Sequence, residues 1–289
     1  MSAVVIQGKP LISSIREEIK SNIAKLSQHG IRPGLVVIIV GDDPASLVYV
    51  NHKAKACEDV GMYSEVHRLP ASTTQEHVIA LIHRFNHDSR IHGILVQSPL
   101  PKHIQEEVIV ESIDPAKDVD CFHPLNVGRL MLGQPSFLPC TPAGVIQILK
   151  RSGIPIAGQH AVVVGRSNIV GKPMAMLLLR EHATVTLCHS KTTQLATITQ
   201  QADILIVAIG IAQFIRAEHV KEGAVVIDVG INRRISDHKL VGDVDFEQVK
   251  HLAGYITPVP GTVGPMTITM LLQNTLESAE RFLKQNASV

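Results

Sequence analysis

Short apolar runs alternate with amphipathic stretches along the chain, and this alternation restricts the possible folds more than any other feature of the sequence. The clearest apolar runs are residues 35–41, 93–97, 161–165, 203–210 and 223–230. Each has the length of one buried strand, and the segments between them have the apolar spacing of helices. Buried strands separated by helices are typical of parallel sheets with crossover connections. The sequence therefore predicts an α/β fold.

The length of the chain and one break in this pattern predict two domains. The chain has 289 residues, and a domain commonly contains about 100–200. Residues 114–142 are rich in proline, glycine and aspartate and show no regular apolar spacing. We therefore expect an N-terminal α/β domain at residues 1–120, a connection at 121–140 and a second α/β domain at 141–264, with a cleft between the domains. The helical segment 265–289 is expected to pack back on the first domain.

Composition and charge exclude several classes of partner. The 27 basic and 26 acidic residues nearly cancel, which gives no electrostatic reason to expect binding to nucleic acid or to an anionic membrane. The apolar runs are far shorter than the ~20 residues that span a bilayer, and Lys9 and Pro10 interrupt any signal-peptide core. The four cysteines form no C-x-x-C pair, as is usual in a reducing compartment. We expect a cytoplasmic protein.

The segment "AVVVGRSNIVGKP" (161–173) has the form of a strand, a tight turn and a helix, with which a dinucleotide-binding unit begins. The usual G-x-G-x-x-G is broken. Gly165 is in place, but Ser167 and Val170 occupy the second and third glycine positions, and Gly171 comes one residue late. A helix N-terminus favours an anion, and Ser167 fits if a pyrophosphate lies slightly further from the backbone. An ordinary strand-to-helix loop is the alternative.

The end of the next strand indicates which dinucleotide would bind. A NAD site commonly has Asp or Glu there to bind the ribose 2′-hydroxyl, but this chain has His189, Ser190 and Lys191. The Ser190 hydroxyl and Lys191, together with Arg166 in the turn, could donate hydrogen bonds to a 2′-phosphate. The pattern therefore predicts NADP rather than NAD. The alternative is that Arg166 and Lys191 are solvated surface charges.

A helix is predicted from about Pro44 to Val60, closed by Gly61, and it carries a possible proton-transfer pair. Tyr49 and Lys53 are four residues apart and share a face, whereas Lys55 points elsewhere. Desolvation lowers the pKa of a lysine towards the range useful for proton transfer. The alternative, which the residues alone favour, is that the stem of Lys53 covers an apolar helix face.

Polar residues also follow the predicted strand at 93–97. Gln97 and Ser98 end this strand, where ligands of open α/β sheets gather. Asp118 and Asp120 alternate in an irregular segment, and solvated turn acids are their usual role. His83 and His87 are four residues apart, but no acid lies between them as in H-E-x-x-H, so no metal site is predicted.

Together these stretches resemble the bifunctional methylenetetrahydrofolate dehydrogenase/methenyltetrahydrofolate cyclohydrolase family. The resemblance covers nearly the whole chain. It rests on these segments in the family's order: "YVNHKAKACEDVG", "GILVQSPLP", "DPAKDVDCFHPLNVGRL", "PCTPAGV", "VVVGRSNIVGKPMA", "TVTLCHSKT", "VVIDVGIN", "LVGDVDF" and "ITPVPGTVGPMTITML". It implies a folate-binding N-terminal domain, a Rossmann-like NADP-binding domain and no metal.

The resemblance also implies catalytic and cofactor residues. Lys53 would be the catalytic lysine, with Tyr49 beside it along the folate. Gln97 would hold and tune the lysine, and Asp120 would hydrogen-bond the pterin ring. The residues implied for NADP are the turn Gly165, Arg166 and Ser167, the 2′-phosphate contact Ser190, and Ile231 near the nicotinamide.

Two of these segments would line the folate. They contribute Val96 and Ser98 from "GILVQSPLP" and Pro258 and Gly261 from "ITPVPGTVGPMTITML". Four positions depart from the family's usual residue. They are Ser98 for Leu, Cys121 for Gly, Leu125 for Tyr and Thr262 for Gly. None removes a proposed chemical group. Cys121 would alter the backbone of its loop if the usual glycine has a positive φ angle.

The implied reaction is oxidation of 5,10-methylenetetrahydrofolate to the methenyl cation and its hydrolysis to 10-formyltetrahydrofolate. A neutral lysine could move protons beside this cation, whereas a protonated one would repel it. A homodimer is also implied, and so is a place in the one-carbon metabolism that serves purine, methionine and histidine biosynthesis. The alternatives are a member that has only the dehydrogenase activity, a dehydrogenase of another small substrate, and a non-catalytic dinucleotide-binding regulator.

Overall fold

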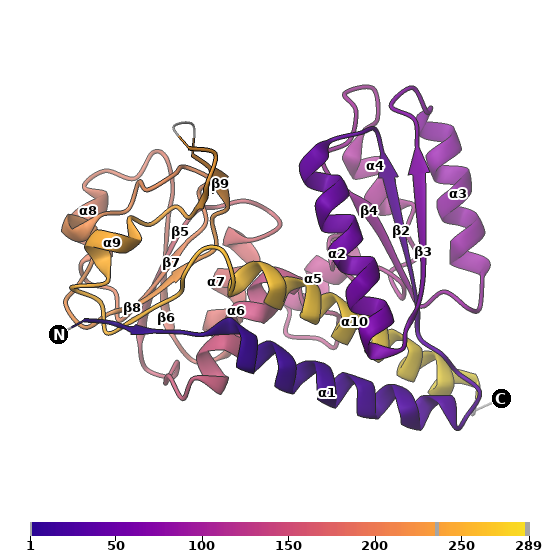
Figure 1. The fold of residues 1–289 in the computed structure, drawn as a ribbon, viewed down its shortest axis with the longest axis horizontal. Helices are drawn as coiled ribbons and strands as arrows, with labels where there is room; N and C mark the ends of the chain where they lie inside the picture. The colour runs from indigo at the N-terminus through magenta and orange to yellow at the C-terminus, as the bar shows by residue number, and fades with distance from the viewer. Residues whose placement is uncertain (1, 235–236, 287–289) are drawn as a thin grey trace. The chain divides into compact units, whose positions relative to one another are not determined.

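The computed structural model describes residues 2–234 and 237–286, and the chain divides into two compact units (Figure 1). The six-stranded unit consists of the residues up to Ser13 together with Thr141–Thr267. The three-stranded unit consists of Ser14–Cys140 together with the residues from Ile268 onward. Both units contain parallel sheets with helices between the strands, so the predicted two-domain α/β fold class is confirmed.

The sheet of the six-stranded unit is parallel throughout, in the order β1-β11-β8-β7-β5-β6. Its strands are β1 (Val4–Val5), β5 (His160–Val164), β6 (Thr184–Cys188), β7 (Ile204–Val207), β8 (Val225–Asp228) and β11 (Tyr255–Ile256). The strands β5, β7 and β8 are apolar runs from the centre of the sheet, and their side chains are almost all buried. Burial on both faces explains why these strands read as continuous apolar runs rather than as alternating ones.

The connections of this unit are short helices and one hairpin. The helices are α6 (Cys140–Arg151), α7 (Gly171–Arg180), α8 (Leu195–Thr199), the 3-10 helix η1 (Ala217–His219) and α9 (Phe246–Val249). The antiparallel hairpin consists of β9 (Asn232–Arg233) and β10 (Leu240–Val241). Because the main strands are parallel, their carboxyl ends, with Gly165 and Ser190 just beyond them, meet at one edge of the sheet.

The three-stranded unit is built on a parallel sheet of order β3-β2-β4. Its strands are β2 (Gly34–Val40), β3 (Tyr63–Leu69) and β4 (Gly93–Gln97). The central strand β2 is buried along its whole length. Its register pairs Ile39 with Gln97, so the carboxyl end of β4 lies beside that of β2.

Helices α2 (Pro44–Val60), α3 (Gln75–His87), α4 (Glu106–Glu111) and α5 (Pro124–Met131) belong to this unit. Local signals fix α2 at the predicted residues. Asp43 accepts a hydrogen bond from the Ser46 amide at 2.8 Å, Pro44 begins the helix, and Gly61 ends it with a φ angle of 85°. The long helices α1 (Gly8–Ser27) and α10 (Val263–Asn286) contribute residues to both units.

The units differ from the predicted domain limits at both ends of the first domain. The residues up to Ser13 group with the six-stranded unit because β1 pairs with β11. Residues 121–140 are not a separate connection. They contain α5 and belong to the three-stranded unit, to which Asn126 is tied by a hydrogen bond from its side-chain amide to the Asp118 carboxylate at 2.9 Å. The first difference arises from a pairing between residues far apart in sequence, and the second from a side-chain contact that apolar spacing does not show.

Two further observations concern the described residues only. None of the helices in residues 2–234 and 237–286 is long and apolar enough to cross a membrane. In the same residues, no three histidine, cysteine or acidic side chains form a group that could hold a metal ion.

Candidate active site

A lysine and a glutamine meet at the carboxyl end of the three-stranded sheet. Lys53, on α2, donates a hydrogen bond from Nζ to Oε1 of Gln97 at 2.9 Å. Gln97 is the last residue of β4, and its amide nitrogen donates to the Ser98 carbonyl oxygen at 2.7 Å. This second bond orients the amide so that its oxygen faces the lysine. Gln97 therefore fixes the position of the Lys53 amine.

The neighbours of Lys53 on α2 differ in their surroundings as their spacing predicts. Tyr49, one turn earlier, is half-buried, and burial raises the pKa of its phenol. Lys55 is exposed and forms an ion pair with Asp59 at 3.4 Å between Nζ and Oδ1. The two lysines thus lie on different faces of the helix, with Lys53 on the face that turns to β4.

Asp118 and Asp120 differ in their burial and in their hydrogen-bond partners. Asp118 is 2% exposed, and its carboxylate accepts bonds from the Phe122 and His123 amides and the Asn126 side chain. The expectation of a solvated turn acid is wrong for Asp118, because these donors replace water. Asp120 is half-buried, and burial raises its pKa while the nearby charge of Lys53 lowers it. The lysine and this carboxyl therefore share one environment.

The cysteines of the chain are all unpaired and buried. Burial raises the pKa of the Cys57 and Cys121 thiols to about 12 and that of Cys140 well above its usual value. Thiols in this state are poor nucleophiles because the reactive thiolate is scarce. Cys140 lies against Asp120, a neighbour that sequence reasoning did not assign although the segment "PCTPAGV" contains it.

The positions that depart from the family's usual residues are accommodated in different ways. Cys121 adopts a φ angle of 62°, and its thiol donates to the Phe137 carbonyl oxygen at 3.0 Å. Ser98 is exposed and donates to the Glu106 carboxylate. Leu125 is 47% exposed on α5. Thr262, fully buried, donates to the Ile6 carbonyl oxygen at 3.1 Å.

The broken glycine motif in the six-stranded unit is explained by close backbone packing. A Cβ atom on Gly165, whose φ angle is 129°, would overlap the Ala208 carbonyl oxygen. A Cβ on Gly171 would overlap the carbonyl oxygen of Gly165 itself. The late glycine is therefore as necessary as the first one. Figure 1 shows α7, which begins at Gly171, beside the sheet.

Ser167 replaces the middle glycine and caps the helix. Its hydroxyl oxygen accepts bonds from the amides of Val170 at 3.2 Å and Gly171 at 3.3 Å. These two amides are consequently occupied within the protein. An anion at this turn would be bound by the amides that precede them and by exposed side chains such as that of Arg166.

The end of β6 lies next to this turn. Gly165 donates from its amide to the Cys188 carbonyl oxygen at 2.9 Å, so the residues after both strands are neighbours. Ser190 and Lys191 are exposed there. The His189 ring nitrogen Nδ1 accepts a bond from the Lys191 amide at 3.1 Å, which fixes the turn that presents Ser190.

The other candidate residues are distributed over both units. Val96 is on β4 with Gln97, and Ser98 follows it, so both lie in the three-stranded unit with Lys53 and Asp120. Pro258 and Gly261 belong to the six-stranded unit, as does Ile231, which is 42% exposed just before β9.

The two histidines considered for a metal site contact each other within α3. The ring nitrogen Nδ1 of His87 lies 2.7 Å from the carbonyl oxygen of His83, in the last turn of α3.

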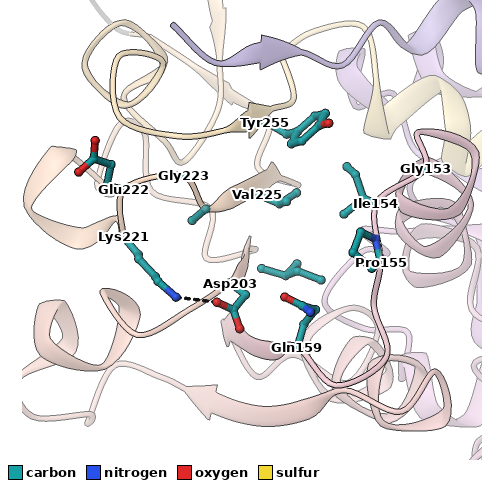
Figure 2. Close-up of a pocket in the computed structure, with 12 residues that line it drawn as sticks. Gly153, Ile154, Pro155, Gln159, Asp203, Lys221, Glu222, Gly223, Val225 and Tyr255 are labelled. Atoms are coloured by element: carbon teal, nitrogen blue, oxygen red, sulfur yellow. Dashed lines mark hydrogen bonds and ion pairs between the residues drawn. The ribbon is translucent and has the colours of Figure 1, made fainter. Parts of the chain in front are cut away.

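A separate pocket of about 240 Å³ lies at the opposite, amino-terminal edge of the six-stranded sheet (Figure 2). Its lining includes Gln159, Tyr255 and the ion pair between Lys221 and Asp203, in which Nζ and Oδ1 are 2.6 Å apart. Asp203 also accepts a bond from the His160 amide. This carboxylate is therefore satisfied within the protein, and none of the candidate site residues lines the pocket.

The comparisons with known proteins decide the family. Residues 6–120 match the model of the tetrahydrofolate dehydrogenase/cyclohydrolase catalytic domain, and residues 139–283 match the NAD(P)-binding domain of the same family. The chain belongs to the tetrahydrofolate dehydrogenase/cyclohydrolase family. This confirms the predicted family and the prediction of a bifunctional methylenetetrahydrofolate dehydrogenase and methenyltetrahydrofolate cyclohydrolase.

Individual relatives of this family are similar over nearly the whole chain. The bifunctional protein FolD of Halalkalibacterium halodurans is 61% identical over 97% of this chain and all of its own length. The FolD crystal structure from Campylobacter jejuni is 53% identical, with a TM-score of 0.95 over 97% of this chain and all of that one. The Trypanosoma brucei FolD, solved with NADP and an inhibitor, is 41% identical, with a TM-score of 0.93 over 98% and 99% of the two chains.

Proposed function

We propose that this chain oxidises 5,10-methylenetetrahydrofolate with NADP and then hydrolyses the 5,10-methenyl product to 10-formyltetrahydrofolate, with Lys53 as the residue that serves the hydrolysis. The observation that carries this proposal is the hydrogen bond from Lys53 to Gln97 at 2.9 Å, with Asp120 close by. These three polar side chains come from α2, from the end of β4 and from the segment that follows α4.

In the oxidation, the bridging carbon of the folate loses a hydride, and the two nitrogens beside it stabilise the cation that remains. NADP, when bound, would supply the acceptor for this hydride and its electron pair. The residues of the chain need only hold the folate in place, because proximity and orientation lower the barrier for the transfer. We assign this holding to Tyr49, Asp120 and the lining residues Val96, Ser98, Pro258 and Gly261.

In the hydrolysis, water adds to the methenyl carbon, one C–N bond breaks and one proton is released. This step needs a group that moves protons beside a cation. Lys53 supplies an amine there, and Gln97 supplies a neutral partner whose oxygen accepts a hydrogen bond from it. A carboxylate in place of Gln97 would instead favour the charged ammonium, which the cation repels.

The turn after β5 and the end of β6 support NADP as the cofactor. Gly165 and Gly171 allow close backbone packing at the two ends of the turn, and residues 166–169 between them are exposed, where a pyrophosphate could reach them. Arg166 and Ser190 are exposed on neighbouring segments and would bind the 2′-phosphate. Ser167 would contribute at the turn, and Ile231 near the nicotinamide.

The proposal extends to a homodimer in the cytoplasm that takes part in the one-carbon metabolism of purine, methionine and histidine biosynthesis. Its support is the resemblance to the family. Light scattering of the purified chain measures the number of subunits, and a monomer would contradict the dimer.

The test of the catalytic assignment is a pair of lysine variants on one helix. Lys53→Met keeps most of the aliphatic stem and removes the amine, so we expect loss of the cyclohydrolase activity with the fold and NADP binding retained. Dehydrogenase activity should fall only to the extent that Lys53 also positions the folate. Lys55→Met, on the exposed face, is the matched control and should change little. Absorbance of reduced cofactor and of the methenyl compound follows both steps. Hydrolysis by Lys53→Met at the parent rate would show that the proposed site is wrong.

A further inference from the structure

Two buried carboxylates tie together the segments at the carboxyl end of β7 and β8 in the six-stranded unit. Asp243 is fully buried and Asp228 is 3% exposed. Asp243 accepts bonds at one oxygen from the amides of Ile209 (2.7 Å) and Gly210 (2.9 Å). Its other oxygen accepts a bond from the side-chain amide of Asn232 at 2.8 Å. We call this arrangement of Asp243, Asn232 and the two amides the Asp243 clamp.

Asp228 holds the clamp in place from the other side. One of its oxygens accepts bonds from the backbone amides of Asp243 and Gly230, each at 3.0 Å, and the other accepts from Val244 at 2.9 Å. The Asp228 amide in turn donates to the Thr257 hydroxyl at 2.8 Å. Asp228 therefore fixes the chain on which Asp243 sits.

Two glycines let the backbone lie directly against these carboxylates. A Cβ atom on Gly230 would overlap the Asp243 carboxylate, and a Cβ on Gly242 would overlap the Asp228 carboxylate. Each glycine therefore lies against the carboxylate that the opposite segment contributes. These glycines are needed for close approach rather than for a turn.

This arrangement is costly if it serves only stability. The pKa of Asp228 is raised to about 7, mainly by burial and in smaller part by the nearby Asp243, although three backbone amides act in the opposite direction. In the described part of the chain neither carboxylate forms an ion pair with a basic side chain. Two buried acids without a cation are unusual in a core that serves stability alone.

The clamp lies where the proposed cofactor site needs a fixed backbone. Ile209 and Gly210 lie in the loop that follows β7, and Gly230 and Asn232 flank Ile231 after β8. Ligands of open parallel sheets bind at this carboxyl edge. Ile231 is 42% exposed there, although both of its neighbours in the chain are bonded to the carboxylates.

We infer that Asp243 is a positioning residue for NADP: it holds the loop at 209–210 and the segment at 230–232 in the geometry that receives the nicotinamide end. This inference rests on the proposed function, because the ligand of the carboxyl edge is NADP there. Asp243 touches no ligand in this role. It acts through Asn232 and the two loop amides, and its loss displaces Ile231.

The polarity of the clamp allows an exchange of partners as a test. In Asp243→Asn, an amide oxygen still accepts from Ile209 and Gly210, but the new NH₂ group faces the NH₂ group of Asn232. In Asn232→Asp, two carboxylates face each other at a position where the native pair is 2.8 Å apart. The double variant Asn232→Asp/Asp243→Asn restores one donor and one acceptor with the direction reversed.

We expect each single variant to raise KM and Kd for NADP by about tenfold and the double variant to recover to within about threefold of the parent. Cyclohydrolase activity on methenyltetrahydrofolate, which consumes no cofactor, should persist in all three. Asp237→Asn is the matched control, because Asp237 pairs with Arg234 near the same hairpin and not with the clamp. Its KM for NADP should remain that of the parent.

Kd is measured by calorimetry and folding by circular dichroism. Single variants with parental NADP affinity, or a double variant no better than the single ones, would overturn the inference. If Asp243→Asn does not fold, Asn232→Ala provides the test, because Asn232 is only half-buried. It should raise Kd severalfold, and an unchanged Kd would also overturn the inference. Failure of the proposed function is seen separately, as a parent chain that lacks both activities.

Discussion

His92 makes the stability of the three-stranded unit depend on pH, with a size that follows from its surroundings. The side chain is 4% exposed just before β4, and its Nδ1 accepts a hydrogen bond from the Gly34 amide at 3.2 Å. Protonation would place an N–H at Nδ1, facing the Gly34 N–H. Burial lowers the pKa of His92 from 6.5 to about 4, and the nearby charge of Lys117 acts in the same direction.

The unfolded chain binds this proton more tightly than the folded chain does. The stabilising contribution of neutral His92 is therefore complete above pH ~6.5 and is lost as the pH falls towards about 4. The full difference is about 3 kcal/mol, since each pKa unit corresponds to about 1.4 kcal/mol. Between about pH 7.5 and about pH 5, the loss is about 2 kcal/mol.

The perturbation is His92→Asn, which keeps an oxygen that can accept from the Gly34 amide and removes the titrating ring. Urea unfolding followed by circular dichroism gives the free energy of unfolding of parent and variant at several pH values. Hydrogen exchange of the β2 and β4 amides reports the same unit locally. The stability advantage of the parent should shrink by about 2 kcal/mol between about pH 7.5 and about pH 5.

His29→Asn, in the same unit but exposed, is the control and should retain the pH dependence of the parent. A parent advantage over His92→Asn that is constant across this pH range would refute the reasoning. It would mean that His92 has the same pKa in the folded chain as in the unfolded chain.

Three other substitutions test separate parts of the account. Arg166→Ala should weaken NADP about ten- to a hundredfold and NAD little, because a charge-assisted contact is worth about 1.5–3 kcal/mol; calorimetry with both cofactors checks this, and equal losses would remove the case for a 2′-phosphate site. Asn274→Leu should lower the free energy of unfolding by about 2–4 kcal/mol, because the buried Asn274 amide donates to the Val119 and Leu138 carbonyl oxygens at 2.7 and 2.8 Å; a change below about 1 kcal/mol in urea unfolding would contradict it. Cys121→Gly relieves a left-handed backbone worth about 1 kcal/mol, but the loss of the buried thiol and the added freedom of the unfolded chain outweigh this relief. We expect net destabilisation of about 1 kcal/mol by thermal unfolding, and a stabilised variant would contradict the ranking.

The elements that the sequence predicted well are those that local signals determine. Helix α2 begins and ends at the predicted residues because Pro44 and Gly61 each act on their own backbone. The buried strands β2, β5 and β7 coincide with continuous apolar runs. In contrast, β1 has only two residues and exists because it pairs with β11, about 250 positions away in sequence. No local pattern contains that information.

The candidate site also has some features that local signals predict and others that depend on tertiary contacts. The shared face of Tyr49 and Lys53 follows from helical spacing, but the contact of Lys53 with Gln97 requires the register of β4 against β2. The family resemblance implied that contact before the geometry was known. Asp243 was not singled out, because nothing in "LVGDVDF" distinguishes a buried acid from a solvated one. The catalytic and binding roles of the individual residues stay predictions until the variants are measured.

The pairing of β1 with β11 has a consequence for how the chain is made. The residues up to Ser13 leave the ribosome long before β11, the strand that receives β1, is synthesised. Completion of the three-stranded unit is delayed in the same way, because this unit includes residues from Ile268 onward. Neither unit is a contiguous piece of the gene product, so a fragment cut at Cys140 leaves both with a missing part. The order of synthesis therefore postpones the completion of both units until the C-terminal helix has emerged.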